Sequence, residues 1–374
     1  MIIVHVHHTF YPVIGGLERV VQKLAETQVK LGHEVHVVTS THGAGGRPRE
    51  ERIGDIYVHR VKALKLYYPD LTVPLEVPRD VLKRADVVHI HSHNSYFNIK
   101  VAEKAKRTGL LIAVHFMAVD ALRSHPNFIV KLLGSYYAKY ILKKALKLAD
   151  LKFVKSYRDK HILKSKYNIE AEYIPDGIDD EFLTKPRDPD RFRDLFGVDE
   201  DFIFLYIGRL HPAKGPQLLI EAASYLQRHA KDKFKVVIMG PGPTKWLIAL
   251  AKRLGVKDLL LITGPVDEEV KISAIDASTC LVVPSLYDYV EVFSLVASEA
   301  WARHKPVVAF AVGELAYRVK HGINGLLIKE RNPQALAKAL QELMSSKYSF
   351  KIEEKLYTWK EIALKLIEFY YKLS

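Results

Sequence analysis

The stretch FIFLYIGRLHPAKGP, residues 202–216, sets the fold class of this chain. It opens with six consecutive apolar or aromatic residues, reaches Gly208, and continues through two cations to Gly215 and a helical pattern. A continuous apolar run, unlike an alternating one, is typical of a strand in a parallel sheet that is covered on both faces. The stretch therefore predicts a strand, a loop and a helix of an α/β fold.

Runs of the same kind recur along the whole chain, and helical patterns separate them. In the first half they lie at 2–7, 34–39, 56–61, 86–91, 110–116 and 151–154. In the second half they lie at 202–208, 234–240, 259–264, 279–285, 306–311 and 325–328. Strands that alternate with helices in this way predict an α/β protein with two doubly wound, Rossmann-like domains.

The division between the domains is expected near the turn-rich, acidic segment YIPDGIDDEF, residues 173–182, because the strand pattern restarts after it. We place one domain at 1–175 and the other at 176–352, and we expect the helical segment 353–374 to cross back onto the first domain. Ligands of such sheets bind beyond the carboxyl ends of the strands, so a cleft that the two domains face is the expected site.

Composition narrows the class of protein. The single cysteine, Cys280, has apolar neighbours and is expected in the core, so no intramolecular disulfide forms. The first residues enter a strand at once, and no apolar run reaches about 18 residues, so we expect a cytoplasmic protein without a signal peptide or membrane span. The net charge is +12 for residues 1–175 and +1 for residues 176–374, so a basic first half can attract phosphates or anionic surfaces.

Two loops after strands carry residues suited to an anionic ligand. Gly15 and Gly16 follow the first strand, where glycine admits backbone shapes closed to other residues and the next helix offers free N–H groups. Arg209 and Lys214 follow the strand at 202–208, where the two cations can neutralise a diphosphate. Either loop alone is also compatible with an ordinary turn.

The stretch YVEVFSLVASEA, residues 289–300, places Glu291 before a predicted helix and Glu299 within it. A glycosidase needs two carboxylates that face each other across a bond, and eight positions along one loop-helix unit do not suggest that arrangement. The spacing favours two acceptors that contact different hydroxyl groups of one elongated ligand. The alternatives are a carboxylate that favours the helix dipole and a surface glutamate.

Together these motifs resemble those of the GT-B glycosyltransferases of the retaining family 4 type. Glu291 and Glu299 match the family's E-x7-E signature, and Arg209 and Lys214 match its G-R-L-x-x-x-K-G motif. Gly15 with Gly16, YIPDGID, GPGP at 240–243 and the segment from KPVVAF to GLLI also match family motifs, so the resemblance covers essentially the whole chain. Departures are Val292 and Ser294, where the family often has glycine, and Asp176 and Glu314.

The resemblance implies transfer of a sugar from a nucleotide-sugar donor, a UDP- or GDP-sugar, to a hydroxyl acceptor such as a glycan or a lipid carrier, with retention. It implies no metal and no other cofactor. The first domain would hold the acceptor and the second the donor. Arg209 and Lys214 would hold the diphosphate, Glu299 the ribose, and Glu291 the sugar. The backbone of Phe293, Ser294 and Leu295 would contact phosphate, and the Gly15–Gly16 turn would also bind the donor. His115 matches the family's histidine beside the transferred sugar.

Other functions compete with this interpretation. The clusters HVHH (residues 5–8) and HIHSHN (89–94) have the H-x-H spacing of zinc hydrolases, which is the main alternative. A relative that binds nucleotide-sugar without turnover is another. The segment 128–150, acid-free as far as residue 149 like the whole span 121–149, has the pattern of a basic amphipathic helix. That pattern suits contact with an anionic membrane or simply a solvated basic face. No nucleic-acid-binding module is recognised, so nucleic acid is not an expected partner.

Overall fold

The computed structural model describes residues 1–374 except 14, 67–70, 126, 229–231, 346–347 and 374. It divides into two compact units, each described here by itself. Unit 1 comprises Met1–Gly177 and Tyr357–Ser374, and unit 2 comprises Ile178–Leu356. The sequence placed the corresponding divisions at 175/176 and 352/353.

Unit 1 is built on an eight-stranded sheet with the order β10-β9-β8-β7-β1-β2-β4-β3. The strand pairs are parallel except for the edge pair β3–β4, which is antiparallel. The strands are β1 (Ile2–Val6), β2 (Glu34–Ser40), β3 (Glu50–Ile53), β4 (Ile56–Val61), β7 (Val87–His91), β8 (Leu111–Phe116), β9 (Leu151–Val154) and β10 (Glu172–Tyr173). A separate ribbon pairs β5 (Ala63–Lys65) with β6 (Thr72–Pro74).

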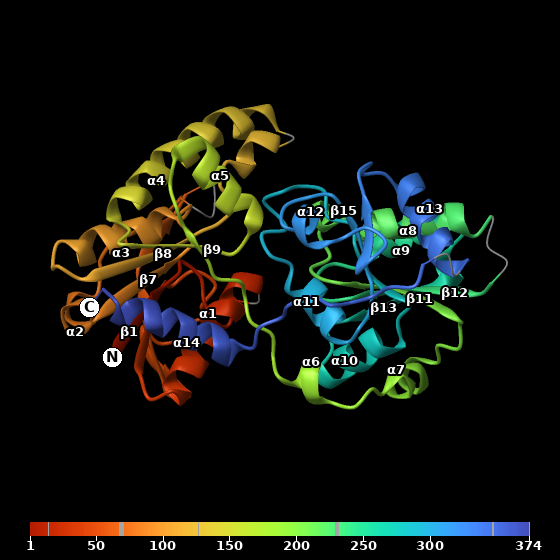
Figure 1. The fold of residues 1–374 in the computed structure, drawn as a ribbon, viewed down its shortest axis with the longest axis horizontal. Coiled ribbons are helices and arrows are strands. Elements are labelled where there is room, and N and C mark those ends of the chain that lie inside the picture. The colour runs from red at the N-terminus through yellow and green to blue at the C-terminus, as the bar shows by residue number, and fades with distance from the viewer. Residues whose placement is uncertain (14, 67–70, 126, 229–231, 346–347, 374) are drawn as a thin grey trace. The chain divides into compact units, whose positions relative to one another are not determined.

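Helices cover both faces of this sheet (Figure 1). On one side are α1 (Gly16–Lys30) and α14 (Trp359–Tyr371), which contact each other. The other side has α2 (Arg79–Arg84), α3 (Tyr96–Lys106), α4 (Ser135–Leu148) and α5 (Tyr157–Tyr167), whose apolar side chains join one core with those of β1, β7 and β8. The start of α14 is fixed by a capping box, in which Thr358 and Glu361 each bond the other's backbone N–H.

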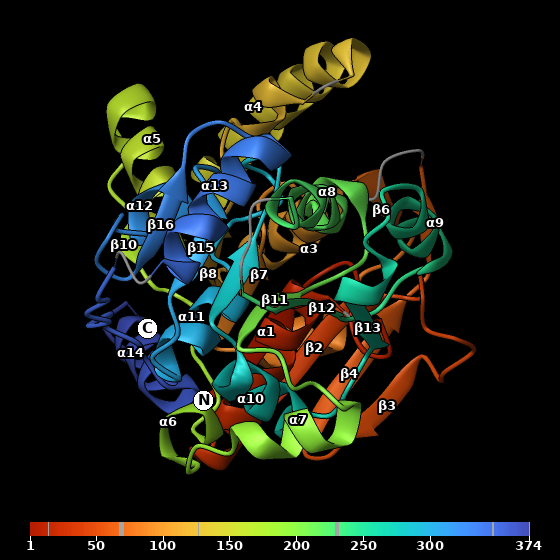
Figure 2. The same ribbon diagram turned by 90° about the vertical axis from the view of Figure 1, so that its right-hand side faces the viewer.

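Unit 2 has a six-stranded parallel sheet with the order β13-β12-β11-β14-β15-β16. Its strands are β11 (Phe202–Ile207), β12 (Phe234–Met239), β13 (Leu260–Gly264), β14 (Cys280–Val283), β15 (Val307–Phe310) and β16 (Gly325–Ile328). Figure 2 shows α8 (Pro216–Leu226), α9 (Lys245–Arg253) and α13 (Pro333–Met344) on one face, and α6 (Glu181–Thr184), α7 (Pro189–Phe196) and α10 (Glu268–Ala277) on the other. The remaining helices are α11 (Leu295–Ala302) and α12 (Leu315–Arg318).

Both sheets contain a point at which the strand order reverses, between β1 and β7 in unit 1 and between β11 and β14 in unit 2. The loops that leave two such strands diverge to opposite faces and open a crevice at the carboxyl ends of the strands. In unit 2 these are the loops that carry Lys214 and Glu291, and in unit 1 they are the loops after residues 6 and 91. The topology therefore brings the sequence motifs of each unit to its own switch point.

The basic segment 128–150 is not one regular helix. Val130–Gly134 form a π-helical turn, and α4 continues from Ser135. No helix in the described part of the chain is both long and apolar enough to cross a membrane.

Candidate active site

The loop after β11 is held tightly against the loop after β14. Gly215 has φ +77°, and a Cβ there would lie 2.0 Å from the carbonyl oxygen of Pro284. Only glycine fits this left-handed backbone at that close approach. The contact fixes the preceding residue, Lys214, at the carboxyl end of the sheet.

Lys214 reaches across to Glu291 within this arrangement. Its ammonium donates to Glu291 Oε1 over 2.6 Å and to the carbonyl oxygen of Val290 over 3.0 Å. Ser285 Oγ also donates to Glu291 Oε1, over 2.7 Å, and the Glu291 side chain is 3% exposed. Both described side-chain partners use Oε1, so Oε2 keeps its acceptor capacity, and the ammonium keeps one of its three donors.

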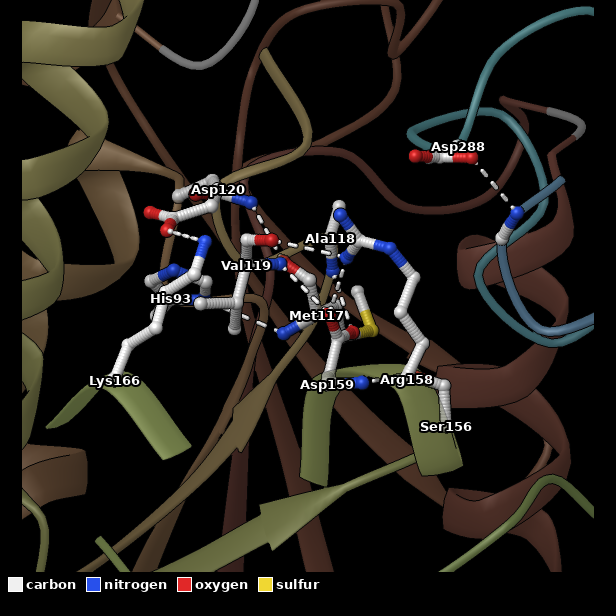
Figure 3. A network of polar contacts seen from close by, with 12 residues as sticks. His93, Met117, Ala118, Val119, Asp120, Ser156, Arg158, Asp159, Lys166 and Asp288 are labelled. Atoms are coloured by element: carbon white, nitrogen blue, oxygen red, sulfur yellow. Dashed lines mark hydrogen bonds and ion pairs between the residues drawn. The ribbon is translucent and has the colours of Figure 1, made fainter. Parts of the chain in front are cut away.

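The backbone of Glu291 is fixed from a third loop. Its carbonyl oxygen accepts from the N–H of Glu314 at 2.9 Å. Gly313 has φ +50°, and a Cβ there would lie 2.0 Å from that same carbonyl oxygen. The Gly313 N–H donates to Asp288 Oδ1 at 3.0 Å, which Figure 3 shows as the isolated pair at its upper right. The glutamate is therefore positioned by loops after β11, β14 and β15.

Helix α11 starts from a strained residue. Ser294, its N-cap, has φ +67°, a left-handed conformation that is costly for a residue with a side chain. Its hydroxyl is buried and has no hydrogen-bond partner among the described residues. The first turn of a helix leaves backbone N–H groups without intrahelical partners, so Ser294 and Leu295 lie where an anion is favoured.

Arg318 supports this helix start. It is 4% exposed and donates to the Phe293 carbonyl oxygen at 3.0 Å and to Ser298 Oγ at 2.9 Å. Its guanidinium also lies over the rings of Phe293 and Trp301, 4.3 and 4.7 Å from their centroids. Sequence reasoning missed this cation, because its targets are a backbone carbonyl and ring faces that no spacing reveals.

Glu299 lies in the second turn of α11 and is buried, at 4% exposure. Its Oε1 accepts from Lys271 of α10 over 3.0 Å. A surface position for Glu299 is thereby excluded, and Lys271 is a second residue that sequence reasoning missed.

Arg209 is exposed beyond β11, and Tyr206 contacts its backbone. The Tyr206 hydroxyl donates to the Arg209 carbonyl oxygen at 2.7 Å. Burial raises the pKa of Tyr206, the charge of Glu291 raises it further, and the charge of Arg209 lowers it. Both charged groups therefore lie within electrostatic reach of one buried phenol.

His115 of unit 1 is buried in β8, and burial lowers its pKa well below the usual value. The loop that follows β8 is strained, since Ala118 and Asp120 have φ values of +53° and +57°. Figure 3 shows how it is held: Asp159 accepts from the N–H groups of Ala118 and Val119, at 2.8 and 2.9 Å. Burial raises the pKa of Asp159.

Gly15 and Gly16 do not have the special backbone shapes that the sequence predicted for them. Gly15 has φ −156° and ψ 166°, an extended backbone that any residue adopts, and Gly16 is not left-handed. A Cβ on Gly15 would instead meet the Glu18 carboxylate at 2.1 Å, whereas a Cβ on Gly16 would meet no described atom within 4 Å. Gly15 leaves space for the Glu18 side chain beside the first turn of α1, whereas Gly16 makes no such room for a described side chain, and neither glycine uses a left-handed backbone.

The histidine clusters do come together in part. His5, His89 and His91 each offer a nitrogen within 4.8 Å of the others, and in the described part of the chain they are the one such group able to hold a metal. His5 and His91 already bond each other over 2.8 Å, and His89 bonds Tyr370 over 2.5 Å. These bonds use part of the hydrogen-bonding capacity of the rings without an ion, and His91 Nδ1 has no partner among the described residues.

Comparisons with known proteins find glycosyltransferases in both halves of the chain. A family model described as Glycosyltransferase Family 4 matches residues 14–182, and one described as Glycosyl transferases group 1 matches residues 187–363. A D-inositol 3-phosphate glycosyltransferase of Frankia alni is 36% identical over 46% of this chain and 44% of its own length. The counterpart of Geodermatophilus obscurus is 37% identical over 46% and 40%. The matched region thus spans less than half the length of these relatives.

A longer match is an uncharacterized glycosyltransferase of Methanocaldococcus jannaschii, 27% identical over 96% of this chain and 95% of that protein. Among solved structures, sucrose-phosphate synthase from Thermosynechococcus elongatus has a TM-score of 0.79 at 21% identity and covers 100% of this chain and 98% of its own. HepE of Anabaena in complex with UDP-glucose has a TM-score of 0.70 at 19% identity, covering 100% and 99%. At these identities the structural likeness concerns the fold. None of the proteins named here is a hydrolase.

Proposed function

The chain belongs to glycosyltransferase family 4, with the GT-B architecture of two Rossmann-like domains, and we propose that it transfers a sugar from a nucleotide-sugar to a hydroxyl acceptor with retention. The observation that carries the proposal is the contact of Lys214 with Glu291 at the switch point of unit 2. Support for the donor class comes from HepE, whose structures contain UDP or UDP-glucose.

The charges at this switch point suit a sugar linked to a diphosphate. Lys214 has one N–H donor to spare and Arg209 is exposed, so two cations are available to a diphosphate. The first N–H groups of α11 add neutral donors for the same phosphates. Glu291 Oε2 can accept from a hydroxyl of the sugar, and Glu299 is proposed to accept from the ribose.

The proposed chemistry breaks the bond from the anomeric carbon to the diphosphate and forms a bond from that carbon to the acceptor oxygen. The acceptor enters from the face that the diphosphate leaves, and its proton passes to the departing phosphate oxygen. Negative charge grows on the diphosphate as the bond breaks. Fixed cations and helix N–H groups stabilise that charge without reorganisation, which is the usual source of a large rate enhancement.

The test is turnover with a panel of UDP- and GDP-sugars, measured as nucleotide release with and without sugar and lipid acceptors. We expect Glu291→Ala to lower turnover about 100-fold and Lys214→Ala to weaken nucleotide binding. Matched controls are Glu330→Ala and Lys329→Ala, whose parent side chains are exposed elsewhere on unit 2. Folded protein that releases no nucleotide across the panel would contradict the proposal. Nucleotide binding without release would instead identify a binding-only relative.

An exposed apolar surface of unit 1 favours a lipid-linked acceptor. The apolar ridge consists of Phe128, Ile129, Leu132, Leu133, Tyr136 and Tyr140, each at least 50% exposed. Lys131, Lys139 and Lys143 beside it are also exposed. Exposed apolar side chains flanked by cations and free of acids match the interface of an anionic bilayer. Lys144, by contrast, is bound to Glu103 over 2.9 Å.

We propose that the apolar ridge contacts anionic lipid. Vesicles of phosphatidylglycerol and phosphatidylcholine should co-sediment with the protein at low salt, and vesicles of phosphatidylcholine alone should bind less. Leu132→Ser with Leu133→Ser should abolish binding, and Lys139→Glu with Lys143→Glu should reduce it. Leu195→Ser, at an exposed leucine of unit 2, is the matched control. Equal binding by all variants would reject the contact.

A further inference from the structure

Polar side chains interrupt the core of unit 1 on the sheet face that α1 and α14 cover. They come from three neighbouring strands and both helices: His5, His89, His91, His115, Gln28 and Tyr370, each at most 1% exposed. Burying polar groups is costly unless they are hydrogen-bonded to one another. The pairing of these atoms therefore determines which ring nitrogens carry protons.

One half of the cluster starts at Gln28. Its amide oxygen, which can only accept, lies 2.6 Å from His5 Nε2, so that nitrogen carries the proton. A neutral imidazole has one N–H, so His5 Nδ1 must accept, and its partner 2.8 Å away, His91 Nε2, must donate. Burial keeps both rings neutral by lowering the pKa of His5 to about 4 and that of His91 well below 6.5.

The other half starts at Tyr370. Burial raises the pKa of its phenol. Gln28 Nε2 has no hydrogen-bond partner among the described residues, so His89 is the one described side-chain partner of the phenol. A buried hydroxyl that donates to nothing is costly. The phenol proton is then free to go to His89 Nδ1 at 2.5 Å. His89 Nε2 in turn carries a proton and donates to His115 Nδ1 at 2.7 Å. That leaves the single proton of neutral His115 on Nε2.

The bonds form two series that do not join: His91 donates to His5 and His5 to Gln28, while Tyr370 donates to His89 and His89 to His115. We call these six residues the histidine chain. His115 Nε2, at its end, has no hydrogen-bond partner among the described residues. A buried polar atom without a partner calls for a ligand or a functional role. His115 is also the penultimate residue of β8, beside the strained loop at the carboxyl end of the sheet.

We propose that Tyr370 of the last helix, acting through His89, fixes His115 in the Nε2–H form, so that this ring presents a hydrogen-bond donor at the end of β8. Tyr370 and His89 are positioning residues in this scheme. The inference rests on the proposed function in one respect: the group that accepts from His115 would be an oxygen of a bound substrate. A fixed donor needs no rearrangement when charge develops on that oxygen.

The ring tautomers are measured directly by long-range proton–nitrogen NMR on full-length protein labelled with ¹⁵N-histidine. Loss of one ring signal in His115→Asn assigns His115. We expect the Nε2–H pattern for His115 in the wild-type protein and a mixture of both tautomers in Tyr370→Phe, where His89 Nδ1 has lost its donor. Tyr371→Phe is the matched control, since that neighbouring tyrosine is 59% exposed.

Kinetics provide the second measurement. Tyr370→Phe should lower kcat about five- to tenfold, the order of one lost hydrogen bond, and leave the KM for donor unchanged. Tyr371→Phe should change neither constant. Loss of packing alone would reduce stability without changing the His115 tautomer.

An Nδ1–H pattern for wild-type His115, or the same His115 pattern in Tyr370→Phe, would overturn the inference, and neither result needs the variant to be active. Stoichiometric bound metal would overturn it too, because an ion on His5, His89 and His91 would take lone pairs that the histidine chain uses. Absence of turnover in wild-type protein would count against the proposed function instead, and the NMR result would still decide the tautomer.

Discussion

Acidification should unfold unit 1 before unit 2. Burial lowers the pKa of His5 and His7 to about 4 and that of His8 and His93 to about 3. In the unfolded chain these groups titrate near 6.5, so the unfolded state binds more protons at mildly acidic pH. The stability of unit 1 is therefore complete above pH 6.5 and falls as the pH drops toward 4.

The size of the loss follows from these values. Each of the four histidines removes about 1 kcal/mol of unfolding free energy at pH 6 and about 2 kcal/mol at pH 5. Together they remove about 8 kcal/mol at pH 5, which is comparable with the whole stability of a typical domain, about 5–15 kcal/mol. In unit 2 the described histidines, His211, His304 and His321, are exposed, so no such loss is expected there.

Urea unfolding at pH 7.5, 6.0 and 5.0, followed by tryptophan fluorescence, separates the units. Trp359 belongs to unit 1, whereas Trp246 and Trp301 belong to unit 2. The transition of Trp359 should shift strongly to lower urea with falling pH, and the transition seen in Trp359→Phe should shift little. His93→Gln should reduce the pH slope by about one proton. Equal shifts of both transitions, or none, would refute the reasoning.

Three further changes have clear expected outcomes. Gly313→Ala should displace Glu291 and lower turnover at least tenfold, because the added Cβ would collide with the Glu291 carbonyl. A nucleotide-release assay measures the turnover, and unchanged turnover would contradict the described loop contact. Thr358→Ala should reduce the unfolding free energy by about 1 kcal/mol, because α14 loses its cap. Urea unfolding measures this loss, and an unchanged unfolding free energy would show that Glu361 alone is enough to cap the helix. Arg318→Ala should lower the unfolding free energy by about 3 kcal/mol and weaken nucleotide affinity, and calorimetry measures both. Weaker affinity without a loss of stability would indicate that Arg318 contacts the ligand directly.

The sequence predicted the sheet framework well, because its central strands are continuous apolar runs between helices. All twelve predicted strands are present, with ends that differ by at most two residues. The strands β3, β5, β6 and β10 were missed. They are two to four residues long and largely exposed or partly exposed, so neither apolar runs nor regular alternation marks them.

The sequence predicted the motifs in single loops, but it did not predict the residues that hold those motifs in place. Lys214 and Glu291 lie 77 positions apart, yet each belongs to a recognisable strand-to-helix loop, so their meeting could be expected from topology. Ser285 donates to the Glu291 carboxylate, Arg318 to the Phe293 carbonyl oxygen, and Lys271 to the Glu299 carboxylate. None of these three contacts has a sequence signature. The histidines of β1 and β7 were noticed as possible metal ligands, but their hydrogen bonds depend on Gln28 and Tyr370 from two distant helices.

The place of α14 in unit 1 has a consequence for biosynthesis. Unit 1 is discontinuous, since residues 178–356 are inserted between its two parts. Domains generally form as they leave the ribosome, but here the sheet face that α1 and α14 share stays partly uncovered until residues 359–371 have been made. Until then His89 lacks its phenol partner and water can reach the rings. A nascent chain halted after unit 2 would thus expose side chains of this sheet face that α14 covers in the folded unit.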